Sequence, residues 1–277
     1  MKNIGAKEVH QLRKMSGAGM MECKSALLES NGDTEKAFKL LRAKGIAKAE
    51  KKSTRNTNEG LIGVRIFENE AVIIEVNSET DFVSRNKEFQ NLVKNILDIA
   101  IKQKGDSAKI VKNSLNNIND AIRKVGENIK FKRSNYIQGN VHSYVHNSLE
   151  KGLGKIGVIL QLNSDQDTDL TDVGKNLCMH IAACSPKSIS EHDLDSSIVD
   201  SEKEIIIQQL KNSNKPENIL SKIIDGKLNT FLEEIILLKQ RYVIDPNMTI
   251  ENYINEMSKN KTNKIKIEKF IRFELGE

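Results

Sequence analysis

Thr80-Asp81-Phe82-Val83 is the stretch whose residue types could do chemistry. It lies where a predicted buried strand, Ala71 to Val76, ends and where, after Ser84 to Asn86, a long helical pattern begins. A carboxylate beside a bulky aromatic at such a turn can act as a probe that enters another protein, because the carboxylate can displace a cation while the ring wedges helices apart. The same residues also allow a structural role, in which Thr80 or Asp81 caps the helix and Phe82 packs against its first turn.

Residues 1–52 predict a compact three-helix domain. Apolar residues recur at helical spacing, a glycine turn at 16–19 separates the first two helices, and Asp33 is a suitable N-cap for the third, which Gly45 is expected to end. Such bundles occur in ubiquitin-associated domains and in some nucleic-acid-binding modules. Residues 48–58 are basic and almost free of apolar side chains, which predicts an exposed linker.

The rest of the chain predicts an α+β core of antiparallel strands and helices in two related halves, 53–139 and 140–277. In the first half, the predicted strands Leu61 to Phe67 and Ala71 to Val76 form a hairpin that leads through the motif into a helix. Residues 72–79 are echoed by residues 158–165, at a constant separation of 86 positions. This internal repeat indicates a duplicated scaffold.

Further strand and helix patterns complete the two halves. Asn140 to His146 is the predicted upstream strand of the second copy, and the helix after that copy carries Leu170 on its apolar face. Ile129 to Ile137 and Ile265 to Leu275 alternate apolar and polar residues, so each is a strand candidate, the first where the halves join and the second as a returning strand.

The repeat also bears on Phe82. Where the first copy has Thr80-Asp81-Phe82, the second has Thr168-Asp169-Leu170 after a two-residue insertion. The scaffold therefore makes this corner with leucine as well, and the turn itself does not demand an aromatic ring. Leu170 could still fill the buried site that a structural Phe82 would fill, so both roles remain open at this point.

Residues 199–238 predict an antiparallel helical hairpin inserted into the second half. Two amphipathic stretches of similar length flank the breaker Asn212-Ser213-Asn214-Lys215-Pro216. A projecting hairpin of this kind contacts a partner or a second subunit, which would make a dimer possible. The alternative is that it packs back on the core.

Composition fits a globular protein of 277 residues, with 38% hydrophobic and 29% charged residues. The net charge of +5 decides little about partners. The N-terminus lacks an apolar signal core and no apolar run is long enough to cross a bilayer, so we expect a cytoplasmic protein without a membrane partner. Cys23, Cys178 and Cys184 are odd in number and lack C-x-x-C spacing, which favours reduced thiols.

Enzymatic chemistry has little support. The sequence contains no phosphate-binding loop, no nucleophile elbow and no His, Cys and Asp set at metal-ligand spacing, so we predict no catalytic residues, no metal site and no cofactor. His180 lies on a mostly apolar helix and is predicted to be a packed or interface histidine rather than a base. Nucleic-acid binding would rest on the linker and on exposed basic residues without interleaved aromatics, namely Lys24, Lys39, Arg42 and Lys44, and is not favoured.

Seven blocks of the chain, taken in order, resemble the elongation factor Ts family of guanine-nucleotide exchange factors for elongation factor Tu. The resemblance covers nearly the whole sequence, and its two main signatures are Leu12-Arg13 with Gly17 to Leu27, and Glu75 to Val83. The other blocks are Asn31-Gly32-Asp33, Val125-Gly126-Glu127-Asn128-Ile129, Ser143-Tyr144-Val145-His146, Met179 to Ala183 with Pro186, and Phe270 to Gly276. The chain departs from the family in a longer loop at 147–155, which leaves the local strand register open, and in ending at Glu277 without the C-terminal helix of some members.

The resemblance implies that the N-terminal bundle and first core half grip the nucleotide-binding domain of elongation factor Tu, GDP-bound or nucleotide-free, while the second half holds a β-domain of that partner. Thr80, Asp81, Phe82 and Val83 would form the exchange motif, with Asp81 and Phe82 entering near the magnesium site so that GDP leaves; this chain would bind no nucleotide itself. The implied partner-binding residues are Met20, Met21, Lys24, Lys52, Val125, Gly126 and His146. Met20 and Met21 offer flexible apolar surface, although one of them is expected to be core.

A third possibility is an interaction protein that binds a GTPase without affecting its nucleotide. Only the exchange motif distinguishes that protein from an exchange factor.

Overall fold

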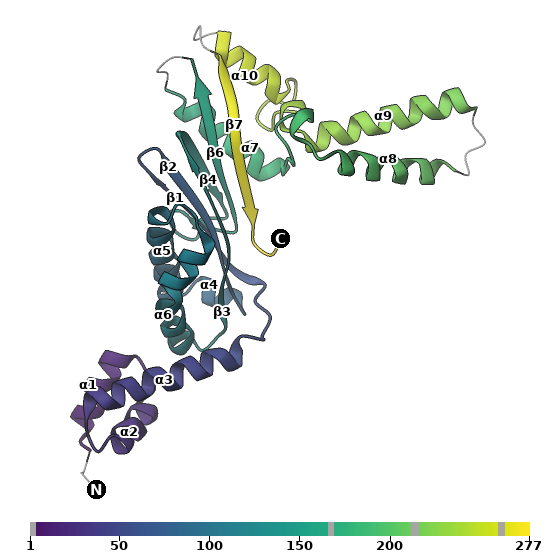
Figure 1. The fold of residues 1–277 in the computed structure, drawn as a ribbon. Coiled ribbons are helices and arrows are strands. Elements are labelled where there is room, and N and C mark those ends of the chain that lie inside the picture. The colour runs from purple at the N-terminus through teal and green to yellow at the C-terminus, as the bar shows by residue number, and fades with distance from the viewer. Residues whose placement is uncertain (1–3, 166–168, 212–215, 260–263) are drawn as a thin grey trace.

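The computed structural model describes residues 4–165, 169–211, 216–259 and 264–277. The molecule is elongated, with three N-terminal helices at one end, two packed sheets in the middle and a helical hairpin projecting beside the far end (Figure 1). Among the helices of these residues, none is both long and apolar enough to cross a membrane.

The N-terminal helices α1 (Ala6–Ser16), α2 (Met20–Glu29) and α3 (Thr34–Lys52) enclose a small core of their own. Gly17 has a φ of 63° and ends α1, as the glycine turn predicts. Asp33 accepts the backbone N–H of Lys36 at 3.0 Å, as expected of an N-cap.

The prediction that Gly45 ends the third helix is wrong. Helix α3 continues to Lys52, so it takes in the first part of the expected linker. Gly45 serves a close approach instead, because a Cβ added there would lie 3.1 Å from Cδ of Arg123 on α6 (Ser107–Val125). A small residue is needed where α3 crosses α6.

The first sheet has the strand order β3-β2-β1-β5. Strands β1 (Glu59–Phe67), β2 (Glu70–Ser78) and β3 (Ile129–Gln138) form an antiparallel meander interrupted by helices, and β5 (Leu153–Gly154) pairs with β1. The 147–155 loop therefore sends two residues of the second half to the edge of the first sheet.

The second sheet has the strand order β4-β6-β7, built from β4 (Asn140–His146), β6 (Ile156–Ser164) and β7 (Ile265–Glu274). Pairing between β4 and β6 runs without a shift from Asn140 opposite Leu162 to His146 opposite Ile156. The longer loop thus leaves the register of this hairpin intact.

The repeat extends to backbone detail. The β2–β3 pairing is interrupted by an irregularity between Glu75 and Val76, and the β6–β7 pairing by one between Gln161 and Leu162. Each position in the second sheet lies 86 residues after its counterpart, as in the sequence echo. Both central strands therefore bend at the same place.

Helices cover the outer faces of the two packed sheets, so the α+β fold class is confirmed. Helices α5 (Lys87–Lys102) and α6 cover the first sheet, while α7 (Thr171–Cys184) and α10 (Ile250–Lys259) cover the second. Between the sheets lies a third apolar cluster, to which β1 contributes Ile62 and β7 contributes Phe273. The sequence reasoning did not identify α6 or α10.

Helices α8 (Ser196–Leu210) and α9 (Glu217–Ile235) form the predicted antiparallel hairpin and extend away from the sheets (Figure 1). The short 3-10 helices η1 (Glu191–Asp193) and η2 (Leu237–Lys239) lie at its base. Most of the predicted breaker, residues 212–215, lies outside the described residues, as does Thr168 of the second motif copy.

Candidate functional site

The turn after β2 carries the four residues of the candidate exchange motif. Thr80 precedes α4 (Asp81–Ser84), and within the described residues its side chain does not cap that helix. Its hydroxyl donates instead to Oε1 of Glu127 at 2.7 Å, and its backbone N–H donates to Oε2 of the same carboxylate at 3.0 Å. The capping role considered for Thr80 is therefore wrong.

The side chains of α4 divide sharply between inside and outside. Val83 belongs to the core under the first sheet, and Ser84 is buried, with its hydroxyl donating to the Asp81 carbonyl at 2.6 Å. Phe82, between them, is 79% exposed. An aromatic ring left in water on a helix that buries Val83 and Ser84 is not packed against the first turn, so the structural role considered for Phe82 is also wrong.

Asp81 sits beside the ring with its side chain 48% exposed. A guanidinium nitrogen of Arg85 lies 4.0 Å from its carboxylate, at the limit of an ion pair, and both groups face solvent. Contacts of this kind contribute little to stability. The carboxylate is thus available to another molecule.

In the second copy of the repeat, the residue that corresponds to Phe82 is buried. Leu170, the counterpart of Phe82, is only 2% exposed and packs in the core between the second sheet and α7. The same corner can therefore hold its apolar residue inside. That Phe82 points outward is a property of the first copy and not of the scaffold.

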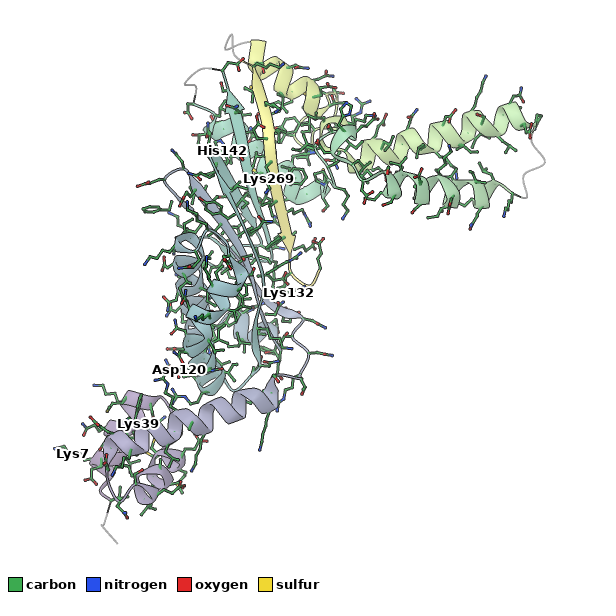
Figure 2. All side chains as sticks on the ribbon, viewed as in Figure 1. Lys7, Lys39, Asp120, Lys132, His142 and Lys269 are labelled. Carbon is green, nitrogen blue, oxygen red and sulfur yellow. The ribbon has the colours of Figure 1, made fainter. Side chains whose placement is uncertain are left out.

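The buried carboxylate of Glu75 belongs to the same sequence block but has a different role. It lies at the bend of β2 and accepts from Nζ of Lys132 at 3.2 Å, from Nε of Arg133 at 2.7 Å and from the backbone N–H of Gly276 at 3.3 Å. Lys132, seen near the end of β7 in Figure 2, also donates to the main-chain oxygen of Glu277. Glu75 therefore fastens the C-terminal residues to the first sheet.

Two predicted partner-binding positions, Lys52 and Gly126, are brought together. Nζ of Lys52, the last residue of α3, donates to the carbonyl of Gly126 at 2.5 Å. Gly126 has a φ of 86° and ends α6, while Val125 packs partly into the core. The end of the N-terminal unit is thus tied to the turn that also carries Glu127.

The other predicted partner-binding residues lie elsewhere on the surface. On α2, Met20 is 46% and Met21 is 74% exposed, and Lys24 is exposed on the same side, so the prediction that one methionine is core is wrong. His146 is exposed at the end of β4, where its Nδ1 lies 3.2 Å from the hydroxyl of Tyr144.

His180 is fully buried, which confirms the prediction of a packed histidine. Its Nδ1 accepts the backbone N–H of Val243 at 3.3 Å, so the proton of the neutral ring is on Nε2, 2.9 Å from Oε1 of Gln240. Burial lowers the pKa of His180, and the hydrogen bond with Gln240 opposes that shift. Gln240 also donates to the carbonyls of Cys184 and Glu234, which joins α7 to the base of the hairpin.

Two of the three thiols lie in the protein interior. These are Cys23 and Cys178, and burial raises the pKa of the Cys178 thiol. In the ranges that the structure describes, no three His, Cys, Asp or Glu residues are placed to hold a metal ion.

Sequence reasoning missed the residues that support the motif turn. Glu127 holds Thr80, and the backbone N–H of Asn128 donates to Oε1 of Glu79 at 2.6 Å. Arg55 lies 3.4 Å from the Glu79 carboxylate, and its carbonyl accepts from the Asn128 amide at 3.0 Å. The signal was the Gly126-Glu127-Asn128 block, although its spacing gives no sign of which backbone groups it meets.

Comparison with known proteins gives matches over most of the chain. A family model described as Elongation factor TS matches residues 79–277. Proteins named Elongation factor Ts align with almost the full chain: that of Bartonella bacilliformis is 44% identical over 287 residues, covering 99% of this chain and 94% of the relative. That of Agrobacterium fabrum is 43% identical, covering 100% and 94%, and that of Brucella anthropi is 42% identical, covering 99% and 93%.

Proposed function

Since the chain belongs to the elongation factor Ts family, we propose that it is a guanine-nucleotide exchange factor that binds elongation factor Tu·GDP during translation elongation and promotes release of GDP. It acts without chemistry of its own, in the cytoplasm where translation takes place. The observation that carries the proposal is the Phe82 ring, which is 79% exposed on a turn whose neighbouring residues are held by the core and by Glu127.

The exchange motif works mechanically. The Phe82 ring enters near the magnesium site of the partner and moves side chains that support the ion, while the Asp81 carboxylate competes for the cation. The phosphate contacts of GDP then loosen. Linkage requires that the factor and GDP weaken each other's binding by the same ratio, and GTP abundance supplies the direction of exchange.

The remaining surfaces hold the partner in place. We assign the N-terminal domain (residues 1–52) and the first core half (53–139) to the nucleotide-binding domain of elongation factor Tu, through Met20, Met21, Lys24, Lys52, Val125 and Gly126. We assign the second core half (140–277), with His146, to a β-domain of the same partner. Two exposed methionines on one helix offer the adaptable apolar surface that such a contact uses.

For the projecting hairpin of α8 and α9, we propose contact with a second copy of the chain; contact with elongation factor Tu is the alternative. The apolar side chains that this contact would use are exposed isoleucines of the two helices: Ile198, Ile205, Ile207 and Ile219.

The test is stopped-flow release of labelled GDP from elongation factor Tu, with and without the protein. Wild type is expected to accelerate release, and Phe82→Ala is expected to remove most of the acceleration, because the wedge is gone while the gripping surfaces are intact. Phe67→Ala is the matched control: Phe67 is also a solvent-exposed phenylalanine, 58% exposed beside the β1–β2 turn, and its loss should leave release unchanged.

Two results would contradict the proposal. Wild type that fails to accelerate GDP release at saturating concentration would exclude the exchange activity. Equal losses for Phe82→Ala and Phe67→Ala would mean that general loss of surface hydrophobicity, and not the motif, explains the effect.

A further inference from the structure

We propose that Glu127 is a positioning residue for the exchange motif: its carboxylate grips Thr80 at both the backbone N–H and the hydroxyl, and thereby holds α4 so that Phe82 and Asp81 face outward. This inference rests on the proposed function. Thr80 N–H to Oε2 is 3.0 Å and Thr80 Oγ1 to Oε1 is 2.7 Å, so each carboxylate oxygen has its own donor. Hydrogen bonds to an ionised acceptor are roughly twice as strong as neutral ones.

The grip begins where the strand ladder stops. The last paired residues of β2 and β3 are Ser78 and Ile129. Beyond them, the segment after β2 and the segment before β3 stay linked through acidic side chains. Glu79 accepts the backbone N–H of Asn128 at 2.6 Å, and Glu127 accepts the backbone N–H of Thr80. The two carboxylates thus replace backbone pairing beyond the end of the sheet, and they hold the two segments together as far as the start of α4.

Glu127 itself is fixed in place by its neighbours. Gly126 before it ends α6 in a left-handed conformation and accepts from Lys52 at 2.5 Å. Asn128 after it is buried, and its amide donates to the Arg55 carbonyl at 3.0 Å. A carboxylate held on both sides can define the position of the segment it binds.

The motif depends on such support because α4 is short. It has one turn, Asp81–Ser84, and its two outward side chains have little packing of their own: the ring of Phe82 is exposed, and the ion-pair partner that the described residues give the Asp81 carboxylate is Arg85 at 4.0 Å. Val83 and Ser84 anchor the end of the turn, and Thr80 anchors its beginning through Glu127. Without the second anchor the ring would sample several directions and enter the partner less often.

The first experiment compares Glu127→Ala with Glu127→Gln. Glutamine can keep both contacts, with its carbonyl accepting the Thr80 N–H and its amide donating to the Thr80 hydroxyl. We expect Glu127→Ala to lower the maximal stimulated rate of GDP release by roughly ten- to a hundred-fold, the penalty for misplacing a reacting group, with little change in the half-saturating concentration. Glu127→Gln should restore most of the rate.

The matched control is Asp106→Ala. Asp106 is also an acidic residue that accepts a backbone N–H, that of Lys109 at 3.1 Å, but it caps the start of α6, away from the motif. The Asp106→Ala variant should lose about as much thermal stability as Glu127→Ala and keep the wild-type rate of GDP release. If Glu127→Ala slows release no more than Asp106→Ala does, the positioning role is overturned.

The second experiment asks whether Glu127 acts through the ring. On a Phe82→Ala background, Glu127→Ala should lower the rate by less than about two-fold, because groups acting as a unit give non-additive losses. Multiplying effects would overturn the inference. A wild-type rate for Phe82→Ala would refute the motif's role in the proposed function, whereas a slow Phe82→Ala with a wild-type Glu127→Ala would refute the positioning role alone.

The third experiment needs no partner. The chain contains no tryptophan, so Phe82→Trp introduces a single indole whose fluorescence anisotropy reports the mobility of the motif side chain. Adding Glu127→Ala should lower that anisotropy at a temperature where circular dichroism shows the protein folded, and adding Glu127→Gln should not. Equal anisotropy in all three proteins would overturn the positioning role independently of any exchange assay.

Discussion

Truncating the two counterpart residues of the repeat, Phe82→Ala and Leu170→Ala, should have opposite consequences. Phe82 is 79% exposed, so only about a fifth of the ~150–250 Å² that an aromatic side chain can bury is buried here. At about 25 cal/mol per Å², its loss should lower the free energy of unfolding by only ~1 kcal/mol. Leu170 is 2% exposed in a packed core, where a leucine-to-alanine change costs about 2–5 kcal/mol.

The assay is urea unfolding followed by far-ultraviolet circular dichroism, with both variants compared with wild type. Each change removes only one side chain from the surface that unfolding exposes. The dependence of the free energy of unfolding on urea concentration should therefore be the same in all three proteins, and the difference in stability should appear in the midpoints. Stimulated GDP release should show the reverse order, with Phe82→Ala slow and Leu170→Ala near wild type while it is folded. A loss of about 3 kcal/mol for Phe82→Ala, in the range of core phenylalanine truncation, would refute the reasoning.

Two further results are expected. If exchange disturbs the magnesium site of the partner, the fold-stimulation of GDP release and the penalty of Asp81→Ala should both shrink in chelator; equal stimulation in both conditions would remove the ion-displacement role. Because burial lowers the pKa of His180, the imidazole binds a proton more readily in the unfolded chain than in the folded one. The contribution of His180 to the free energy of unfolding is therefore complete above about pH 6.5 and is lost as pH falls from there toward the folded pKa. Between pH 7 and pH 5.5, the urea midpoint should fall less for His180→Gln than for wild type. The control is His192→Gln, a change at an exposed histidine, whose midpoint should fall as much as that of wild type. Equal falls in all three proteins would contradict the buried neutral ring.

Apolar runs, alternation and the internal echo predict each strand named above except β5, whose two residues lie in the 147–155 loop. The β1, β2 and β6 patterns are short apolar runs bounded by turn residues, whereas β4 is more polar and is predicted from its place before the second copy of the echo. Helix α6 was missed although its apolar residues recur at helical spacing, because four asparagines and two serines lower its intrinsic helix propensity. Its helical state depends on burying Ile110, Ile118 and Ile122 against α5 and the first sheet, which a local pattern does not reveal.

The end of α3 shows the same limit. A glycine after an apolar stripe ordinarily marks a helix end, and Gly45 was interpreted in that way. Here the missing side chain makes room for Arg123, which is far away in the sequence, and the helix continues to Lys52. The consequence matters for the site, because the extra turns carry Lys52 to the Gly126 carbonyl beside Glu127.

Local sequence was also enough to predict the exposed residues of the candidate site, but not the distant residue that supports them. Residue types and the strand-to-helix corner were sufficient to single out Asp81 and Phe82. The contrast with Leu170 showed that the corner does not need an aromatic, and exposure then distinguishes the two copies. The motif is held by a carboxylate 47 residues away in the sequence, and the partners of that carboxylate include a backbone group, which carries no residue-type signal.

The two halves share one bend and differ in the segment after it. Both central strands are irregular at positions 86 residues apart, so the backbone pairing of both is interrupted at the equivalent place. After the bend, the second copy inserts two residues and buries its leucine, whereas the first goes directly into a one-turn helix whose start is held by Glu127. The two halves therefore differ at this corner: in the first, Glu127 holds the start of the turn and Phe82 projects, whereas the corresponding leucine of the second half is part of its core.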